Sequence, residues 1–592
     1  MIFSNCEGIG KLRFYRGKDI LSAKRCIITG IGRLRGGKKC PVCRNGGIMA
    51  KTLYYGGPIL TMKAENDYVE SLVEEDGKII YTGSLEGARK LCGDGAEETD
   101  LQGKTLMPSF IDPHGHISMV AQFTSLADLS ECTDFDGIVE TLKAYQAEKQ
   151  IGPDGIIMGF GYDHNFLKEQ RHPDKSVLDR VSEEIPIYVL HTSSHMGAGN
   201  SAMLKLAGIS SSTPDPEGAR FGRVAGTMEP DGYAEEMGAI GQMLMAAAPR
   251  LKMDVDAQIV SAQETYLKNG ITTCQDGAAG AGDIKNFARA ASQGNLVIDV
   301  VSYPVMDDNT GDLLKEYADY DKTYRNHFKI GGLKIVLDGS PQGKTAWLSS
   351  PYEGEKDYCG YPAKTDEEVF KYAKEAIARD EQLLAHCNGD AASEQFLDFY
   401  EKALSESDNP HKNQLRPVMI HCQTVRDDQL DRMAELSMIP SIFVAHTYYW
   451  GDIHLKNLGR VRGSRISPAR SAFDRGLKVN FHQDPLVVQP KMLHTVWCAV
   501  NRITRNGVEI GPEQRVSVFE ALQAVTVNGA YAYFEEDRKG TLEEGKLADM
   551  VILSDNPMAV DPGKICDICV LETIKEGVVR YTKQQADSNG QI

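Results

Sequence analysis

Short apolar runs alternate with amphipathic stretches along most of the chain. Each run ends in a polar or glycine-containing loop, and the stretches between the runs have the residue spacing of helices. The eight runs are residues 105–116, 270–277, 296–304, 331–340, 382–390, 416–423, 438–448 and 476–485. Repeated strand–helix units of this kind predict an α/β fold whose parallel strands close into a (β/α)8 TIM barrel over residues 105–535.

Residues 365–380, "TDEEVFKYAKEAIARD", show the helical pattern most clearly. Thr365 and Glu368 have the spacing of a capping box, in which each side chain satisfies a backbone N–H at the start of a helix. The apolar positions that follow lie on one helical face: Val369, Phe370, Ala373, Ala376 and Ile377. This segment is therefore predicted to be a helix packed on the barrel.

Two regions do not follow the strand–helix pattern. Residues 120–250 separate the first predicted barrel strand from the second by far more than one helix, and they contain additional strand-like runs. We expect an insertion there, built over one end of the barrel. The flanking segments 52–83 and 545–582 alternate between apolar and polar positions, as antiparallel strands do. They predict a small composite β-sandwich made from residues 49–104 and 536–585.

The amino-acid composition indicates the broad class of protein. The chain has 592 residues, of which 42% are hydrophobic and 25% are charged, and this suits a large globular protein of more than one domain. The net charge of −18 argues against a nucleic-acid-binding surface, and no apolar run approaches the roughly 18–20 residues that cross a membrane. The 13 cysteines are scattered through apolar contexts, which favours a reduced, cytoplasmic protein without a disulfide framework.

Residues 1–48 differ from the rest of the chain because they hold eleven Lys or Arg residues against Glu7 and Asp19. This basic head could be a targeting segment or an interaction tail. Its single Cys40-x-x-Cys43 pair has no second pair at finger spacing, so it is a weak zinc signal. We prefer a third interpretation, in which Met49 is the initiator and residues 1–48 are a translated leader.

Polar side chains stand at or near the ends of the predicted barrel strands, where a polar group is costly to bury without a partner. These residues are His114, His116, Lys334, His386, His421 and Asp484. In a barrel of this type the reactive groups gather at the carboxyl ends of the strands, so the six side chains should converge. Neutral imidazole and carboxylate suit Zn²⁺, Mn²⁺, Fe²⁺ or Co²⁺, and the set therefore predicts a metal centre.

Several of these segments are familiar. "LMPSFIDPHGHI" resembles the "PGFIDxHxH" signature of the amidohydrolase superfamily, which consists of metal-dependent hydrolases. "KIVLDGSPQGKTAWL", "HCNGDAA", "IHCQ", "HQDPLV" and "ADMVILSDNP" are similar to further superfamily motifs in the same order. With "SSHMGAGNSAML", they make the chain most similar to the amidohydrolase-3 branch, which includes N-substituted formamide deformylase. The resemblance extends over residues 50–582.

The resemblance implies a binuclear centre. His114 and His116 would hold one divalent ion, Zn²⁺ by preference, and His386 and His421 the other. Lys334 would bridge them as a carbamate formed with CO₂, since burial favours its neutral amine. If Lys334 is unmodified, the expected centre has one ion, held by His114, His116, His386 or His421, and Asp484. Asp484 would also move protons during the hydrolysis of an amide by a metal-activated hydroxide.

Substrate-binding residues are less clearly marked. The loops and the insertion contribute polar and aromatic candidates, for each of which a structural hydrogen bond is an equal alternative: Asp163, His164, His195, His446, Tyr448 and Trp450. The chain also departs from the family at Ile420, where relatives often carry an acid, and at His482, which stands where small residues are common. We expect His482 to crowd the mouth of the site and to influence substrate choice. For Cys274 we favour a packing role.

The leading prediction is a metal-dependent amidohydrolase that cleaves a C–N bond, other than a peptide bond, in an N-formyl, N-acyl or cyclic amide. Its expected partner is a small-molecule amide. We expect neither a nucleic acid nor a membrane as a partner, and the sequence leaves open whether the chain forms a homo-oligomer. One alternative is a heterocycle deaminase of the same superfamily, although these enzymes usually carry a glutamate about three residues after the histidine that corresponds to His386. Another is a non-catalytic regulatory protein on the same barrel.

Overall fold

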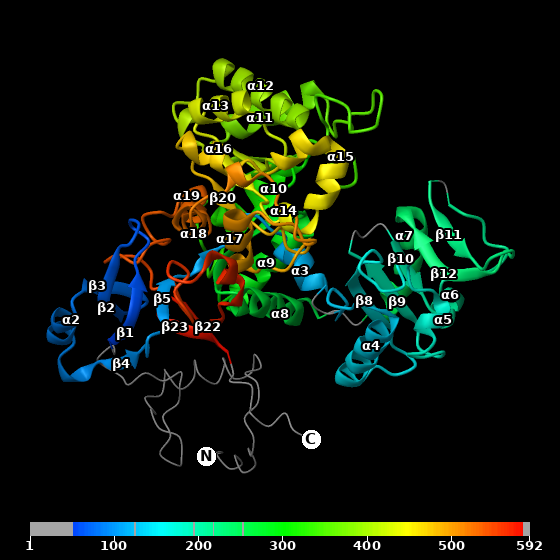
Figure 1. The fold of residues 1–592 in the computed structure, drawn as a ribbon, viewed down its shortest axis with the longest axis horizontal. Helices are drawn as coiled ribbons and strands as arrows, with labels where there is room; N and C mark the ends of the chain where they lie inside the picture. The colour runs from blue at the N-terminus through cyan, green and yellow to red at the C-terminus, as the bar shows by residue number, and fades with distance from the viewer. Residues whose placement is uncertain (1–50, 124–125, 193–195, 217, 252–253, 584–592) are drawn as a thin grey trace, which may run out of the picture.

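The computed structural model describes residues 51–123, 126–192, 196–216, 218–251 and 254–583 (Figure 1). The basic head with its Cys40–Cys43 pair, the proposed initiator Met49 and the candidate residue His195 lie outside these described residues. Among the described helices, none is both long enough and apolar enough to span a bilayer.

Both ends of the described chain meet in one eight-stranded sheet. Its strands run in the order β23-β22-β21-β5-β1-β2-β3, and β4 pairs with β1. The bounds are β1 Thr52–Leu60, β2 Tyr68–Glu75, β3 Lys78–Gly83, β4 Glu97–Asp100, β5 Thr105–Pro108, β21 Met550–Leu553, β22 Val570–Lys575 and β23 Val578–Thr582. Ile59, Leu72, Met550 and Ile574 share one buried cluster, so apolar residues from the two chain ends hold the sheet together. A two-layered sandwich stays a prediction.

Two parallel sheets carry the predicted barrel strands, in the orders β15-β14-β13-β6 and β16-β17-β18-β19-β20. Their bounds are β6 Phe110–Ile111, β13 Ile271–Ala279, β14 Asp299–Pro304, β15 Phe328–Ile330, β16 Leu333–Val336, β17 Leu383–Cys387, β18 Val418–His421, β19 Ile439–Ile442 and β20 Asn480–Phe481. Ile111, Val301, Leu384, Ile420 and Ile439 come from both sheets and pack in one buried cluster. The sheets therefore face a common interior. Among the described pairings none joins β20 to β6, and full closure of the barrel stays a prediction.

At two of the predicted strands the structure has two short strands where the sequence predicted one. The first apolar run, residues 105–116, supplies β5 to the outer sheet and only the short β6 to the barrel sheets. The fourth run is preceded by β15, and Gly331 and Gly332 separate β15 from β16. A Cβ on Gly332 would lie 2.3 Å from the carbonyl oxygen of Gln382, so the close approach of the chains requires glycine at this break.

Helices follow most of the barrel strands. Helix α11 begins with the predicted capping box, in which Thr365 Oγ1 accepts from the Glu368 N–H and the Glu368 carboxylate accepts from the Thr365 N–H. The helices of this part are α3 Ile117–Phe123, α8 Val255–Lys268, α9 Ala281–Gln293, α10 Thr310–Glu316, α11 Asp366–Ala378, α12 Asp390–Glu406, α13 Asp427–Glu435, α14 His446–Tyr449, α15 Gly451–Ser464, α16 Ala469–Asp474, α17 Met492–Asn501, α18 Val518–Ala524 and α19 Val527–Ala532. Helix α2, Leu85–Cys92, packs on the outer sheet.

The region predicted as an insertion forms its own six-stranded sheet, in the order β11-β12-β10-β9-β8-β7. Its elements are β7 Ala127–Asp128, α4 Phe135–Lys149, β8 Ile157–Tyr162, α5 Lys175–Leu178, β9 Ile187–His191, β10 Met196–Gly199, α6 Ser201–Leu206, β11 Arg220–Arg223, β12 Pro230–Glu235 and α7 Glu236–Ala247. Two buried apolar clusters pack on this sheet, one on each face, because successive side chains of a strand point to opposite faces. The buried residues of both clusters all come from the insertion. Figure 1 shows it to one side of the barrel strands, with the outer sheet on the other.

A buried network of charges connects the outer sheet to the barrel. Lys575 Nζ, at the end of β22, lies 2.7 Å from Asp299 Oδ2 at the start of β14 and 2.8 Å from Asp549 Oδ2. Lys539 Nζ also lies 2.6 Å from Asp299 Oδ2. Because all four side chains are buried, each charge depends on its partners for stabilisation.

Candidate metal centre

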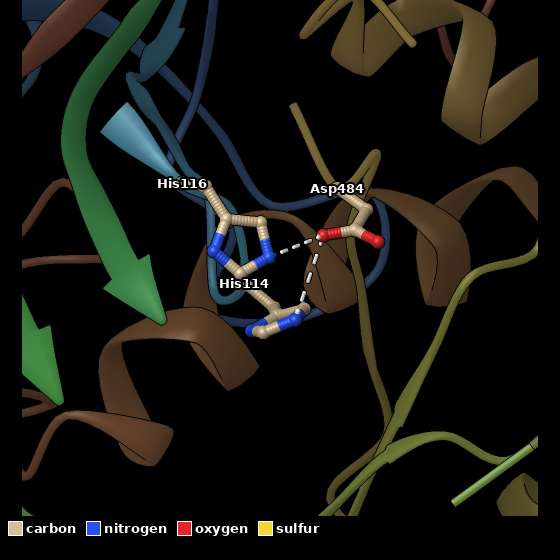
Figure 2. A group of neighbouring side chains, drawn as sticks. All are labelled: His114, His116 and Asp484. Atoms are coloured by element: carbon tan, nitrogen blue, oxygen red, sulfur yellow. Dashed lines mark ion pairs between the residues drawn. The ribbon is translucent and has the colours of Figure 1, made fainter. Parts of the chain in front are cut away.

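Three of the predicted ligands point toward one another (Figure 2). His116 Nε2 lies 3.2 Å from Asp484 Oδ1, and His114 Nε2 lies 3.5 Å from the same oxygen. The two histidines stand in the loop that follows β6, and Asp484 follows β20 with a φ of 53°. Residues separated by some 370 positions in the chain are thus brought together at one end of the parallel strands, as the sequence predicts.

The other two predicted imidazoles join the same cluster. His386 lies in β17, and His421 ends the neighbouring parallel strand β18 with a φ of 77°. Their ring centroids are 4.5 Å apart, and the rings of His421 and His114 are 5.4 Å apart. The structure therefore brings all four predicted histidine ligands into one group.

Each of three imidazoles is oriented by a hydrogen bond through Nδ1, as metal-binding histidines commonly are. The pairs are His114 Nδ1 with Gln275 Oε1 at 2.6 Å, His386 Nδ1 with Asp338 Oδ1 at 3.1 Å, and His421 Nδ1 with His482 Nε2 at 3.1 Å. His386 Nε2 also lies 3.3 Å from Asn388 Nδ2. Because Nδ1 is engaged in each ring, Nε2 is the nitrogen left to face a cation, and in His386 a cation would have to displace Asn388 from Nε2.

Lys334 completes the group from β16. Its side chain is buried, and Nζ has no hydrogen-bond partner among the described residues. Burial lowers the pKa of this lysine to about 8, although the carboxylate of Asp484 acts in the opposite direction. A buried amine without a partner is costly, and it is a group that a ligand or a covalent modification would satisfy.

The electrostatics of the cluster favour neutral rings for His114 and His421 beside an ionised carboxylate of Asp484. Burial, followed by the charge of Lys334, holds the pKa of His114 well below its usual range, and burial with the neighbouring His386 does the same for His421. Burial alone would raise the pKa of Asp484, but the hydrogen bond from His116 and the nearby positive charges bring it below its ordinary value. Neutral nitrogens and a carboxylate are the forms that bind divalent metal ions.

The fold and this cluster together define a hydrolase of the amidohydrolase family, a metal-dependent class. A family model described as "Amidohydrolase family" matches residues 97–581, and the chain belongs to that family. The Bacillus subtilis protein named "Putative amidohydrolase YtcJ" is 27% identical over 90% of this chain and 100% of its own. N-substituted formamide deformylase of Arthrobacter pascens is 26% identical over 89% of this chain and 97% of its own. An uncharacterized metal-dependent hydrolase from Pyrococcus horikoshii shares the fold, with a TM-score of 0.69, 24% identity, and coverage of 87% of this chain and 99% of its own.

The residues fit the metal that this family implies. Ligand atoms about 2.0–2.1 Å from a tetrahedral ion are about 3.3 Å from one another. The contacts of Asp484 Oδ1 with His116 Nε2 and His114 Nε2, at 3.2 and 3.5 Å, agree with that spacing. Lys334, without a partner beside these groups, adds a further nitrogen that the protein itself leaves unsatisfied.

The predicted substrate residues fall in two places. His446, Tyr448 and Trp450 lie at α14, where the ring centroids of His446 and Trp450 are 4.6 Å apart and His446 Nδ1 lies 3.1 Å from His454 Nε2. Asp163 and His164 lie instead in the insertion, after β8. Their roles in substrate binding stay predictions, and so does that of His195, which lies outside the described residues.

His482 is fully buried between two polar partners. Besides His421 it contacts Ser441 Oγ, 2.9 Å from its own Nδ1. From the sequence, His482 was expected to crowd the mouth of the site and to influence substrate choice. The contacts of Ser441 and Gln275 with the histidines were not expected. Asp338 could have been found, because it stands in the family-like "LDGS" segment that follows Lys334. Cys274 is buried among apolar side chains, in agreement with the packing role favoured for it.

Two cavities differ in their relation to the metal centre. None of the six predicted site residues lines either cavity, and the difference lies in how near each comes to them in the chain. One cavity, of about 550 Å³, is lined by Lys329, Phe534 and Glu535. The other, about 470 Å³, lies between the insertion and residues 485–491, directly after Asp484. The second cavity is therefore the better candidate for substrate, although the first is larger.

Proposed function

We propose that this protein hydrolyses a C–N amide-type bond, other than a peptide bond, in a small molecule bearing an N-formyl, N-acyl or cyclic amide. The observation that carries the proposal is the gathering of four imidazoles and Asp484, together with the buried, unpartnered amine of Lys334, whose charge acts on His114, His421 and Asp484. Hydrolases of this family use metal ions, and a centre with these ligands is suited to the attack of water on a carbonyl.

His114 and His116 would hold one divalent ion, Zn²⁺ by preference, and His386 and His421 a second. When bound, such ions lower the pKa of a coordinated water towards about 7 and polarise the substrate carbonyl. Asp484 and a carbamate on Lys334 would complete the ligand set and supply negative charge. With Lys334 unmodified, the alternative is one ion held by His114, His116, His386 or His421, and Asp484.

Lys334 is suited to carbamate formation by its burial. Because its pKa is lowered to about 8, a useful fraction of the amine is neutral near physiological pH. The nitrogen lone pair of the neutral amine attacks the carbon of CO₂, and the nitrogen then releases a proton. The product is a carbamate with one negative charge, which replaces an ammonium that would repel a cation.

Asp484 would act as the proton carrier. Its carboxylate is held ionised in contact with His116 and His114, so it can accept a proton from the attacking water. The same carboxyl group would then deliver that proton to the nitrogen of the departing amine, which leaves as a neutral product. One residue therefore serves both as base and as acid.

The substrate class rests on two further observations. The similarity to N-substituted formamide deformylase covers nearly the whole of both chains and favours an N-formyl or related N-acyl amide. The cavity beside Asp484 is lined by Phe123, Phe160, Leu486 and Val487, which would accept an apolar substituent of the substrate.

Local structure argues against the deaminase alternative. Gly389 stands three residues after His386, where a glutamate would be expected. The next residue, Asp390, accepts from the Ser349 backbone N–H at 3.0 Å and from Arg426 Nη1 at 3.2 Å. Its carboxylate is thus already engaged.

A hydrolysis screen of the full chain, purified and supplied with Zn²⁺, tests the proposal. N-formyl, N-acyl and cyclic amides are compared, amine release is followed, and heterocycles with exocyclic amino groups are included to detect ammonia release. We expect amine release from at least one amide. Ammonia release alone would support deamination, and near-stoichiometric metal without turnover of any amide would contradict the proposed reaction.

A further inference from the structure

A second group of metal-binding side chains lies in the insertion. Asp163 and His164 directly follow β8, and His191 ends β9, the parallel neighbour of β8, with Tyr162 paired to His191 in register. His164 Nδ1 lies 3.2 Å from His191 Nε2, and Asp163 Oδ1 lies 3.4 Å from His191 Nε2 and 3.8 Å from His164 Nδ1. The three atoms form a compact triangle at the ends of two strands.

We propose that Asp163, His164 and His191 bind a divalent transition-metal ion, Zn²⁺ foremost, at a site independent of the catalytic centre. Two imidazoles and a carboxylate form a ligand set that Zn²⁺ accepts, and tetrahedral ligands at ordinary bond lengths are about 3.3 Å apart. Two of the observed separations, 3.2 and 3.4 Å, lie close to that value, and the third, 3.8 Å, is somewhat longer. A water molecule or another small ligand would occupy the remaining position.

Neighbouring groups hold these ligands in place, as they do at established metal sites. Asp163 Oδ1 accepts hydrogen bonds from the backbone N–H of Asn165 and from Asn165 Nδ2, both at 2.9 Å. The ring of His172 stacks on that of His164 with centroids 4.0 Å apart, and His172 Nδ1 lies 3.0 Å from the hydroxyl of Tyr162. Contacts with Asn165 and His172 therefore hold the side chains of Asp163 and His164 in position.

The charge states of the group are those that a cation requires. Burial, and then the proximity of His191, lowers the pKa of His164, so that its ring is neutral at physiological pH. Hydrogen bonds from His191 and Asn165 outweigh burial and lower the pKa of Asp163. The contact between His164 and His191 needs a proton on one of the facing nitrogens, and a bound ion would displace that proton to the other ring nitrogen or to solvent.

The site is separate from the catalytic centre in its construction. All three ligands belong to the insertion sheet, which has its own apolar clusters and contributes none of the six predicted catalytic ligands. The loop that carries the ligands also touches the barrel part, because the guanidinium of Arg505 lies 3.7 Å from the centroid of the Phe166 ring. An ion at Asp163 and His164 would fix this loop, and with it the contact between the two parts.

Metal content of the full chain tests the proposal. The wild type and the variants Asp163→Asn and His164→Ala/His191→Ala are stripped with chelator, reloaded with Zn²⁺, dialysed and analysed by mass spectrometry. We expect both variants to hold about one equivalent less than the wild type while keeping the catalytic-site ions. The control His411→Ala removes an exposed histidine that forms an ion pair with Asp380, and it should not change the metal content. Equal metal content in all four proteins would overturn the proposal.

A second readout removes the contribution of the catalytic centre. In a background in which His114, His116, His386 and His421 are all replaced by Asn, Co²⁺ is titrated and its visible absorption is recorded, since tetrahedral Co²⁺ absorbs far more strongly than the hydrated ion. We expect a saturable band that disappears when His164→Ala is added. A band that persists after that addition, or no band at all in the background variant, would contradict the site. Should the background variant misfold, the single variant His164→Ala in the wild-type chain provides the same comparison through the loss of one class of Co²⁺ sites.

Discussion

His482 Nε2 lies 3.1 Å from His421 Nδ1, and the other nitrogen of His482 lies 2.9 Å from Ser441 Oγ. The chain Ser441–His482–His421 is entirely buried. It fixes which nitrogen of His421 faces the metal centre, because Nδ1 is already engaged. This relationship gives a function to a histidine that stands where the family usually has a small residue.

Replacement of His482 by phenylalanine should weaken metal binding. An aromatic ring is kept at this position, but His421 Nδ1 loses its partner and the orientation of its imidazole is no longer fixed. Loss of such an outer contact typically costs roughly 10–100-fold in metal affinity. Competition with a chromophoric chelator measures the effect, and Ser441→Ala, one hydrogen bond further away, should show a smaller change. Wild-type affinity in His482→Phe would refute the positioning role.

Asp484→Asn should retain metal and lose turnover. The amide keeps an oxygen near His114 and His116 but cannot accept the proton of the attacking water, a role worth roughly 10²–10⁴-fold in rate. Metal content and kcat are measured on the same preparation. A variant with full activity would show that Asp484 is not the proton carrier, and a variant without metal would show that it acts mainly as a ligand.

Lys334→Met should stabilise the protein when metal and CO₂ are both absent. The folded-state pKa of about 8 lies below the ordinary 10.5, so burial of the charged lysine costs about 3 kcal/mol. This cost is fully present below pH 8, diminishes as the pH rises from 8 to 10.5, and is absent above that range. Urea unfolding across pH 7–10 should therefore show a gain in the variant that fades with rising pH. A gain that is constant with pH would exclude this cause.

The same substitution should abolish hydrolysis if the lysine carries a carbamate. Activity of the wild type, prepared free of CO₂, should rise after bicarbonate is added together with Zn²⁺, since the modified nitrogen is then regenerated. Lys334→Met should not respond to bicarbonate. Wild-type activity that needs Zn²⁺ but is indifferent to bicarbonate would favour the one-ion centre with an unmodified lysine.

Lys575→Met should destabilise the fold by about 3–5 kcal/mol, because it leaves the buried carboxylates of Asp299 and Asp549 short of a cation. The contrast is Lys315→Met, which breaks an exposed pair with Asp312 and should change the free energy of unfolding by less than about 1 kcal/mol. Urea unfolding of the three proteins gives the comparison. Equal stabilities would show that the network is not what attaches the outer sheet to the barrel.

The convergence of the candidate ligands was largely predictable from the sequence, because these residues stand on or just after apolar strands whose parallel arrangement is itself predictable. His114, His386 and His421 illustrate this, since each follows a run that forms β6, β17 or β18. The division of the first run between β5 and β6 was not predictable, because both halves are equally apolar and only tertiary pairing assigns them to different sheets.

The insertion was the least predictable part. His191 stands in the same apolar run as His195, and nothing in the pattern shows that it pairs with the end of β8. Only the register between Tyr162 and His191 brings it to Asp163 and His164. Long-range pairing of this kind depends on the whole insertion sheet and leaves no local motif. The positioning roles of Gln275 and Ser441 were hidden for the same reason.

Amine release from an N-formyl or N-acyl amide by the chelator-treated protein, before and after Zn²⁺ is restored, tests the account most directly. The account predicts negligible release from the stripped protein, recovery with added Zn²⁺, and no recovery in Asp484→Asn. Two results would contradict the account. One is amine release that continues unchanged after the metal has been verifiably removed, and the other is no amine release from any amide by the fully metal-loaded protein.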